Sequence, residues 1–166
     1  SGTGALAVTI GSADASVDMS TISGTAATTF LVTDVSNAVT FTGTLAATTS
    51  IADGNTLTVA ANKVASKTIG KVGSSGTGIL AVRIGTADAA VDMTSITSTA
   101  ASTTFTVFEN TTFTGTLASV ATGVANGVTL TLAAAKAAGK TITGTGSGSV
   151  NVTALDATLS ADLSNV

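Results

Sequence analysis

The side chains in this sequence that could do chemistry are few, and carboxylates are the main kind among them. Nine residues are Asp or Glu, and His, Cys, Tyr and Trp are all absent. Without them, Ser-His-Asp and Cys-His nucleophiles and the usual zinc sites are excluded. A glycosidase would need only two carboxylates, but clefts for sugars normally carry aromatic platforms, and five Phe are the only aromatic residues here. We therefore expect no enzyme activity.

Acidic residues recur in pairs at a spacing of four, and one member returns near the C-terminus. Carboxylate oxygens suit Ca²⁺, but residues four apart on an extended strand lie about 13 Å apart, so a shared ion requires a turn between them. The Gly-Gly and Asp nonapeptide pattern of calcium-binding solenoids is absent. Two interpretations stay open: solvated acids beside a corner, or Ca²⁺ bound between repeats or molecules. The residues concerned are Asp14, Asp18, Asp88, Asp92 and Asp162.

A second candidate site is a pair of Thr-rich segments, at residues 40–45 and 112–117. Each predicts a strand with Thr on one face and buried Phe and Leu on the other. Gly43 and Gly115 lie between the apolar residues, where we expect a side chain to collide with an adjacent layer. Such Thr ladders can order water against ice, but a polar strand face looks the same wherever charges are avoided. The Thr residues concerned are Thr40, Thr42, Thr44, Thr112, Thr114 and Thr116.

The elements that must position these residues belong to an internal repeat. Residues 2–22 and 76–96 are identical at 15 of 21 positions, at an offset of 74, and a weaker third copy begins near Gly148. Such periods identify arrays in which each unit completes its neighbour's core. We divide the chain into copy one (residues 1–75), copy two (76–147) and the start of a third copy packed on the second (148–166). The chain opens inside a repeat, like an excised piece of a longer protein.

Within each copy, period-two alternation predicts short strands. Apolar residues alternate over 6–10 and again over 80–84. A further strand is predicted after Asp14, with Val17 and Met19 inward.

The Ala-rich stretch at 133–139 predicts one and a half turns of helix, which Gly139 ends. It is too short to stand alone, so we expect it to form a corner that turns the chain into the next strand.

Two all-β architectures fit about six short strands per copy. The preferred one is a β-solenoid of tandem repeats of about 72 residues, because copies follow without a linker and the aromatic-poor composition suits a narrow coil. The alternative is two small antiparallel β-sandwich domains in tandem.

Charge and composition narrow the partners. Only 9% of residues are charged, the net charge is −3, and the six Lys and Arg are scattered singly. There is therefore no basic stripe, and we expect no nucleic acid partner. The longest apolar runs are far too short to cross a bilayer, so membrane insertion is not expected either.

Three segments carry a resemblance to known proteins: LTLAAAK at 130–136, GKTITGTG at 139–146 and ADLSNV at 161–166. They resemble the Thr- and Ala-rich β repeats of bacterial surface-layer proteins and large secreted adhesins. The resemblance implies an extracellular or cell-surface location and a structural or adhesive role, often with Ca²⁺, and it transfers no catalytic residue.

The functional prediction is a non-catalytic structural repeat module of a bacterial surface layer, fibre or adhesin. Its expected partners are other copies of itself or adjacent repeats, because an uncapped β array exposes unpaired backbone groups that attract another chain. The alternative is a ligand-binding module that recognises ice or a surface glycan.

Overall fold

The structure of the chain is a computed structural model that describes residues 5–22, 27–154 and 162–166. The chain forms two compact units. The first unit comprises Ser1–Val59, Ser66–Ala81 and Ile96–Thr103, and the second comprises Ala60–Ala65, Val82–Ser95 and Thr104–Val166. The fold is mostly β, so the all-β prediction is confirmed.

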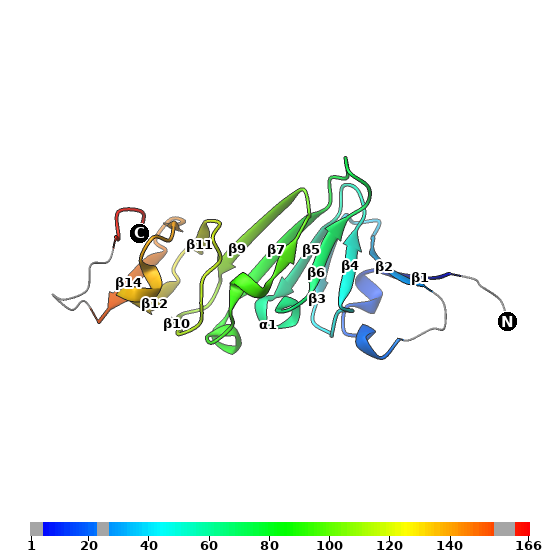
Figure 1. Cartoon of the computed structure of the whole chain (residues 1–166). Helices are drawn as coiled ribbons and strands as arrows, with labels where there is room; N and C mark the ends of the chain where they lie inside the picture. Colours follow the sequence, from blue (N-terminus) through cyan, green and yellow to red (C-terminus); the bar gives the residue numbers. More distant parts are fainter. Residues whose placement is uncertain (1–4, 23–26, 155–161) are drawn as a thin grey trace. The chain divides into compact units, whose positions relative to one another are not determined.

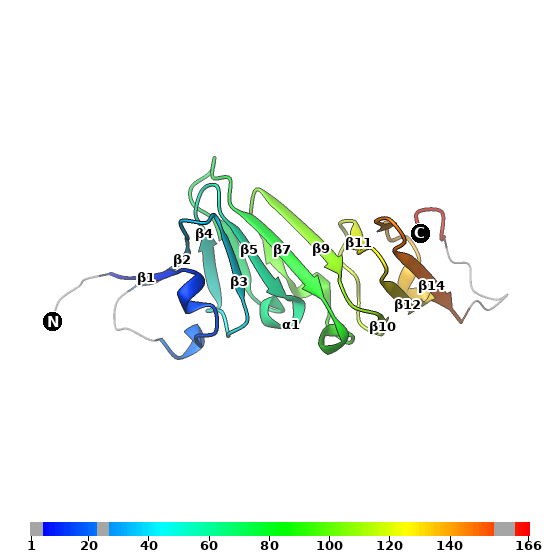
Figure 2. The same ribbon diagram turned by 180° about the vertical axis from the view of Figure 1, so that it is seen from behind.

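The first unit contains a sheet of five strands in the order β1-β2-β4-β6-β8, together with a pair formed by β3 and β5 (Figures 1 and 2). The described pairings in both are parallel. The strands are β1 (Leu6–Ile10), β2 (Thr28–Val32), β3 (Ala38–Phe41), β4 (Thr48–Ile51), β5 (Thr56–Ala60), β6 (Thr68–Lys71) and β8 (Thr97–Ser98).

The second unit contains two sets of three strands, in the orders β9-β11-β13 and β10-β12-β14, and these pairings are also parallel. The strands are β9 (Ser102–Val107), β10 (Thr111–Phe113), β11 (Thr122–Val124), β12 (Thr129–Ala133), β13 (Ile142–Gly144) and β14 (Ser149–Thr153).

One further strand, β7 (Ile79–Ile84), contributes residues to both units. In the first unit it starts beside β5, where the Ile79 N–H donates to the Asn55 carbonyl oxygen at 2.9 Å. In the second unit it ends beside β9, where the Phe108 N–H donates to the Ile84 carbonyl oxygen at 3.1 Å. The strand therefore has a neighbour on each edge.

From β2 onward, successive strands in each unit alternate between two sheets, whereas β1 pairs directly with β2. In the first unit β2, β4 and β6 belong to one sheet, and the intervening β3 and β5 pair with each other. In the second unit β9, β11 and β13 alternate with β10, β12 and β14. Parallel neighbours need a crossover connection, and here a strand of the other sheet provides it. The antiparallel alternative disagrees with these pairings.

Two 3₁₀ turns follow β1, and two follow the equivalent strand β7 of the next copy. They are η1 (Ser12–Asp14), η2 (Met19–Thr21), η3 (Thr86–Asp88) and η4 (Met93–Ser95). The strand predicted after Asp14 is therefore wrong. Met19 is buried as expected, but Val17 is 43% exposed. The physical reason is that Asp14 and Asp18 accept hydrogen bonds from nearby backbone N–H groups, which favours turns over a strand ladder.

The predicted Ala-rich corner is confirmed as the short helix α2 (Ala134–Ala137), and copy one has its equivalent in α1 (Ala61–Val64). Gly139 follows α2 with φ +67°, the left-handed conformation that a glycine adopts without strain. Ser66 takes the same position after α1 with φ +60°.

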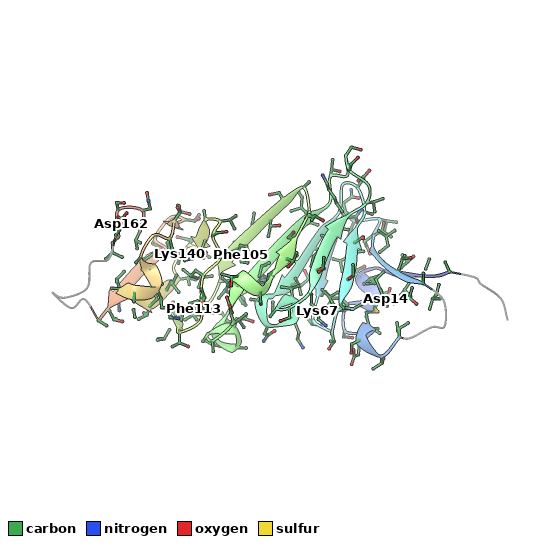
Figure 3. The ribbon with its side chains drawn as sticks, viewed as in Figure 1. Asp14, Lys67, Phe105, Phe113, Lys140 and Asp162 are labelled. Atoms are coloured by element: carbon green, nitrogen blue, oxygen red, sulfur yellow. The ribbon has the colours of Figure 1, made fainter. Side chains whose placement is uncertain are left out.

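The predicted core residues of the Thr-rich segments are confirmed: Phe41, Leu45, Phe113 and Leu117 are all buried, and Phe113 is labelled in Figure 3. The strands are shorter than expected, since β3 ends at Phe41 and β10 at Phe113.

Both Thr-rich segments leave their strands in the same way. In copy one, the N–H groups of Thr42 and Gly43 both donate to the Ala15 carbonyl oxygen, at 2.7 and 3.0 Å. A side chain on Gly43 would meet the Val17 carbonyl oxygen, and one on Gly115 would meet that of Val91. The predicted collision with an adjacent layer is therefore confirmed, and the layer is the 3₁₀ segment of the same copy.

Candidate functional site

The first acid of each pair closes a turn with its side chain. Asp14 accepts the Gly11 N–H at 3.0 Å, and Asp88 accepts the Gly85 N–H at 2.9 Å. Asp88 also accepts the N–H of Asn62, which lies in α1, at 2.8 Å. Asp88 is only 2% exposed, whereas Asp14 is half-buried. Both carboxylates therefore bond to backbone N–H groups, and Asp88 joins its own turn to α1.

The second acids are exposed and share another turn. Asp18, Asp92 and Asp162 each accept the backbone N–H of the residue two positions later, at 2.9, 2.9 and 3.0 Å. The hydroxyl of Thr94 donates to Asp92 at 2.6 Å, and these bonds from Thr94 lower the pKa of the Asp92 carboxyl. The bonds from Ser164 lower the pKa of Asp162 in the same way. The start of the third copy thus repeats the turn of the first two.

These acids do not form a metal centre in the part of the chain that the structure describes. Among residues 5–22, 27–154 and 162–166, no three Asp or Glu side chains come together in a group that could hold an ion. Each of the five acids instead accepts backbone N–H groups in its own turn. Calcium binding stays a prediction from the sequence.

The six Thr residues chosen from the sequence divide into two sets. Thr40, Thr42, Thr112 and Thr114 are exposed, whereas Thr44 and Thr116 are half-buried. The hydroxyls of Thr42 and Thr114 donate to the carbonyl oxygens of Ala15 and Ala89, both at 3.2 Å. Thr44 and Thr116 form isolated parallel bridges with Asp18 and Asp92. Four of the six therefore take part in docking the 3₁₀ segments.

Another row of Thr residues is exposed on neighbouring strands of the first unit. Thr48 of β4 is paired with Thr68 of β6, and Thr68 is paired with Thr97 of β8. All three are exposed. Sequence reasoning missed this row because its members lie on different strands, 20 and 29 residues apart, so no Thr-x-Thr pattern marks them.

Four further acceptor side chains, which sequence reasoning missed as site residues, join segments 21 to 24 residues apart. We call them the corner acceptors: Asp34, Asp53, Glu109 and Asn126. Each accepts the backbone N–H of a Ser or Thr lying 21 to 24 residues away, at distances between 2.8 and 3.1 Å. The partners are Ser12 for Asp34, Thr77 for Asp53, Thr86 for Glu109 and Ser147 for Asn126.

Asp34 is the most strongly bonded corner acceptor. It accepts the N–H and hydroxyl of Ser12 at 2.8 and 2.7 Å, and the N–H and hydroxyl of Ser36 at 2.8 and 2.6 Å. These bonds, above all the one from the Ser36 hydroxyl, hold the pKa of Asp34 far below its usual value. A search for acceptors and hydroxyls one strand pair apart could have found this pattern.

Comparison with protein-family models, with curated proteins and with solved structures finds no significant match for this chain. Among the described residues, no helix has both the length and the apolar character needed to cross a membrane.

Proposed function

We propose that the chain is a non-catalytic structural module of a bacterial cell-surface layer, fibre or adhesin, coiled as a β-solenoid whose repeats supply length and assembly contacts. The observation that carries the proposal is the alternation of successive strands between two parallel sheets in each unit. A chain that returns to the same sheet after every second strand adds one rung at a time, and each rung needs its neighbours.

The use made of polar side chains also supports this proposal. The corner acceptors and the recurring acids bond to backbone N–H groups, and several do so between segments more than 20 residues apart. Such bonds fix corners of a coil. Solubility then rests on hydroxyls, in keeping with a charged fraction of only 9%, which suits a protein held in a lattice or fibre.

A chain with one added repeat tests the proposal. Gly78 and Gly148 are equivalent, so a second copy of residues 78–147 inserted after Ser147 preserves the strand order. The insert carries β7 to β13, seven strands shared between two sheets, and should lengthen the molecule by about 17 Å at roughly 4.8 Å per rung. Small-angle X-ray scattering measures the increment for one and two inserts.

The control insert is residues 78–137, which omits the last strand and breaks the strand order. It should lower the unfolding midpoint, while the complete insert should not. An increment of about 28 Å, the diameter of a separate 70-residue globule, would contradict a continuous coil. Antibodies against the chain should label intact source cells if the surface location is right.

The exposed Thr row on β4, β6 and β8 favours one second candidate, binding to ice. Its rungs repeat at about 4.8 Å, and Thr presents a methyl and a hydroxyl at each. If this face binds ice, Thr68→Tyr should abolish ice-recrystallisation inhibition and Thr40→Tyr, on β3, should not. An unmodified chain that leaves ice growth unchanged would remove this candidate.

A further inference from the structure

Two strands that share one repeat position lie at the ends of their sheets. β1 ends the order β1-β2-β4-β6-β8, and β14 ends the order β10-β12-β14. Both belong to the same sequence element as β7: the three segments read ALAVT at 5–9, ILAVR at 79–83 and SVNVT at 149–153. In the described part of the chain, neither end strand has a second strand on its outer edge.

The strand β7 shows what both edges look like when covered. Leu80 and Val82 are 0% and 1% exposed between β5 and β9. The equivalent residue in β1, Leu6, is 41% exposed, and Val150 in β14 is only half-buried. Apolar side chains that are inside the core in β7 therefore reach solvent at the two ends.

The two open edges are opposite edges of the same kind of strand. The Ser149 N–H donates to the Val128 carbonyl oxygen at 2.9 Å, as the Ile79 N–H does to that of Asn55. β14 therefore keeps the first neighbour of β7 and has no second one among the described strands. In β1, Ile10 accepts the N–H of Thr33 at 3.0 Å, as Ile84 accepts that of Phe108. β1 therefore keeps the second neighbour and, in the part of the chain that the structure describes, has no strand in the place of the first.

The backbone groups at these edges complement each other. Leu6 and Ile10 bond toward β2, so Ala7 and Thr9 direct their N–H and C=O groups outward. Ser149 bonds toward β12, so Val150 and Val152 direct theirs outward. A parallel pair with Val150 opposite Leu6 lets Val150 accept the N–H of Ala7, and places both apolar side chains on the core face.

We propose that copies of this chain associate head to tail by pairing β14 of one copy with β1 of another, parallel, with Val150 opposite Leu6 and Val152 opposite Val8. The inference rests on the proposed function and names its assembly contact. Edge pairing of this kind gives affinity through main-chain hydrogen bonds and register through alternate side chains. The joint differs from β7 by one extra strand, because a single strand has both neighbours in β7 whereas two strands share them at the joint.

The other set of strands in the second unit, β9-β11-β13, is already covered in part at β13, so we place the joint at β14. The Gly139 N–H donates to the Asp162 carbonyl oxygen at 3.0 Å, and the Ile142 N–H donates to that of Asn165 at 2.9 Å. Residues 162–166 thus bond to the α2 corner and to β13. Among the described strands of this unit, β14 is the end strand with a repeat equivalent in β1.

Cysteine pairing tests the joint on the full chain, which has no native Cys. Ala7 and Asn151 are exposed and would lie opposite each other, at a strand separation that a disulfide spans. Mixing the Ala7→Cys and Asn151→Cys chains, one carrying a size tag, should give a mixed disulfide at least tenfold above Asn151→Cys mixed with Thr48→Cys. Thr48, on β4, is also exposed but lies away from the joint.

A second measurement removes dependence on the disulfide. Ala7→Pro takes away the N–H that Val150 would accept, on an edge that β2 does not use, so the chain should fold but fail to associate in concentrated light-scattering measurements. Ala7→Ser, which keeps the N–H, should associate normally.

Two outcomes would overturn the inference. The first is equal association of the Pro and Ser variants. The second is preferential disulfide formation between Asn151→Cys and Thr29→Cys, which would mean that β14 displaces β1 and pairs with β2. Inserts that lengthen the molecule as expected, without any crosslink at position 7, would keep the proposed function and refute only this contact.

Discussion

The two nearly identical segments 2–22 and 76–96 have different surroundings. Leu80 is completely buried, whereas its equivalent Leu6 is 41% exposed. Asp88 is 2% exposed and accepts N–H groups from Gly85 and Asn62, whereas Asp14 is half-buried. The residues that cover the second segment, β5 and α1, come from the preceding copy.

The difference shows which interactions belong to a copy and which belong to the boundary between copies. The 3₁₀ turns and the docking of the Thr-rich segment recur in both copies, because the backbone hydrogen bonds that form them lie within one copy. Burial differs for the leading strand of each copy, which is β1 in copy one and β7 in copy two. It differs because residues of the preceding copy cover this strand. Repeat arrays have this energetic form, with an intrinsic term for each repeat and a term for each interface.

The largest expected effect is at the leading strand. Leu80→Ala should lower the free energy of unfolding by about 2–5 kcal/mol, because it leaves a cavity in a packed core. Leu6→Ala should cost less than about 1 kcal/mol, since Leu6 is exposed. Urea unfolding followed by circular dichroism measures both. Equal losses would show that the preceding copy does not stabilise this strand.

The glycines of the Thr-rich segments should show no difference between copies. Gly115→Ala and Gly43→Ala each force a Cβ against a backbone carbonyl, and both should destabilise by about 3 kcal/mol. Gly123→Ala is the matched control, because its nearest atoms would lie 3.6 and 3.8 Å away, and it should change the unfolding midpoint little. A large difference between Gly43→Ala and Gly115→Ala would contradict the assignment of this contact to the copy itself.

Asp88 and Asp14, which occupy the same turn in the two copies, should differ in how much their substitution destabilises the fold. Asp88→Asn puts an amide donor against two backbone donors in a buried place, and should cost about 2 kcal/mol. Asp14→Asn should cost less than about 1 kcal/mol, since water reaches Asp14. The measurement is the same urea titration at pH 7. If Asp14→Asn proves the more harmful, the bond from Asn62 is not a stabilising boundary contact.

The smallest expected effect concerns pH. The pKa of Asp34 and the pKa of Asp92 are lowered in the folded chain from 3.8 by hydrogen bonds that favour the charged form. Their contribution is present above the unfolded value, near pH 4, and is lost as the pH falls through the lower folded values. The urea midpoint should therefore fall between pH 5 and pH 2, and fall less for Asp34→Asn. Identical pH profiles for the variant and the unmodified chain would contradict this role of Asp34.

Some of the fold could be predicted from residues alone. Strict alternation marked the leading strands, the Thr-rich segments placed Phe41 and Phe113 in the core, and Ala followed by Gly139 marked α2. The strand predicted after Asp14 was wrong. Its apolar residues alternate as in a strand, but the Asp side chains compete for the backbone N–H groups that a strand ladder would use.

The alternation between two sheets could not be predicted, because the repeat of about 72 residues hides a shorter spacing. The paired strands β4 and β6, for example, have the unlike sequences TTSI and TIGK, 20 residues apart. The acids of the candidate site could be found from the sequence, but the backbone N–H groups that they bind could not. The corner acceptors act on partners 21 to 24 residues away, a separation that no local pattern displays.

The near-identity of the segments that contain β1 and β7 has a consequence for how such a gene can change. Residues 2–22 and 76–96 are near-identical at an offset of 74, and β7 accepts a β5-type strand on one edge and a β9-type strand on the other. Recombination between the DNA encoding these two segments therefore adds or deletes one whole copy and leaves every strand beside the kind of neighbour it had. Copy number can then vary between descendants of one gene while each strand keeps its kind of neighbour, so the number of repeats becomes a heritable trait.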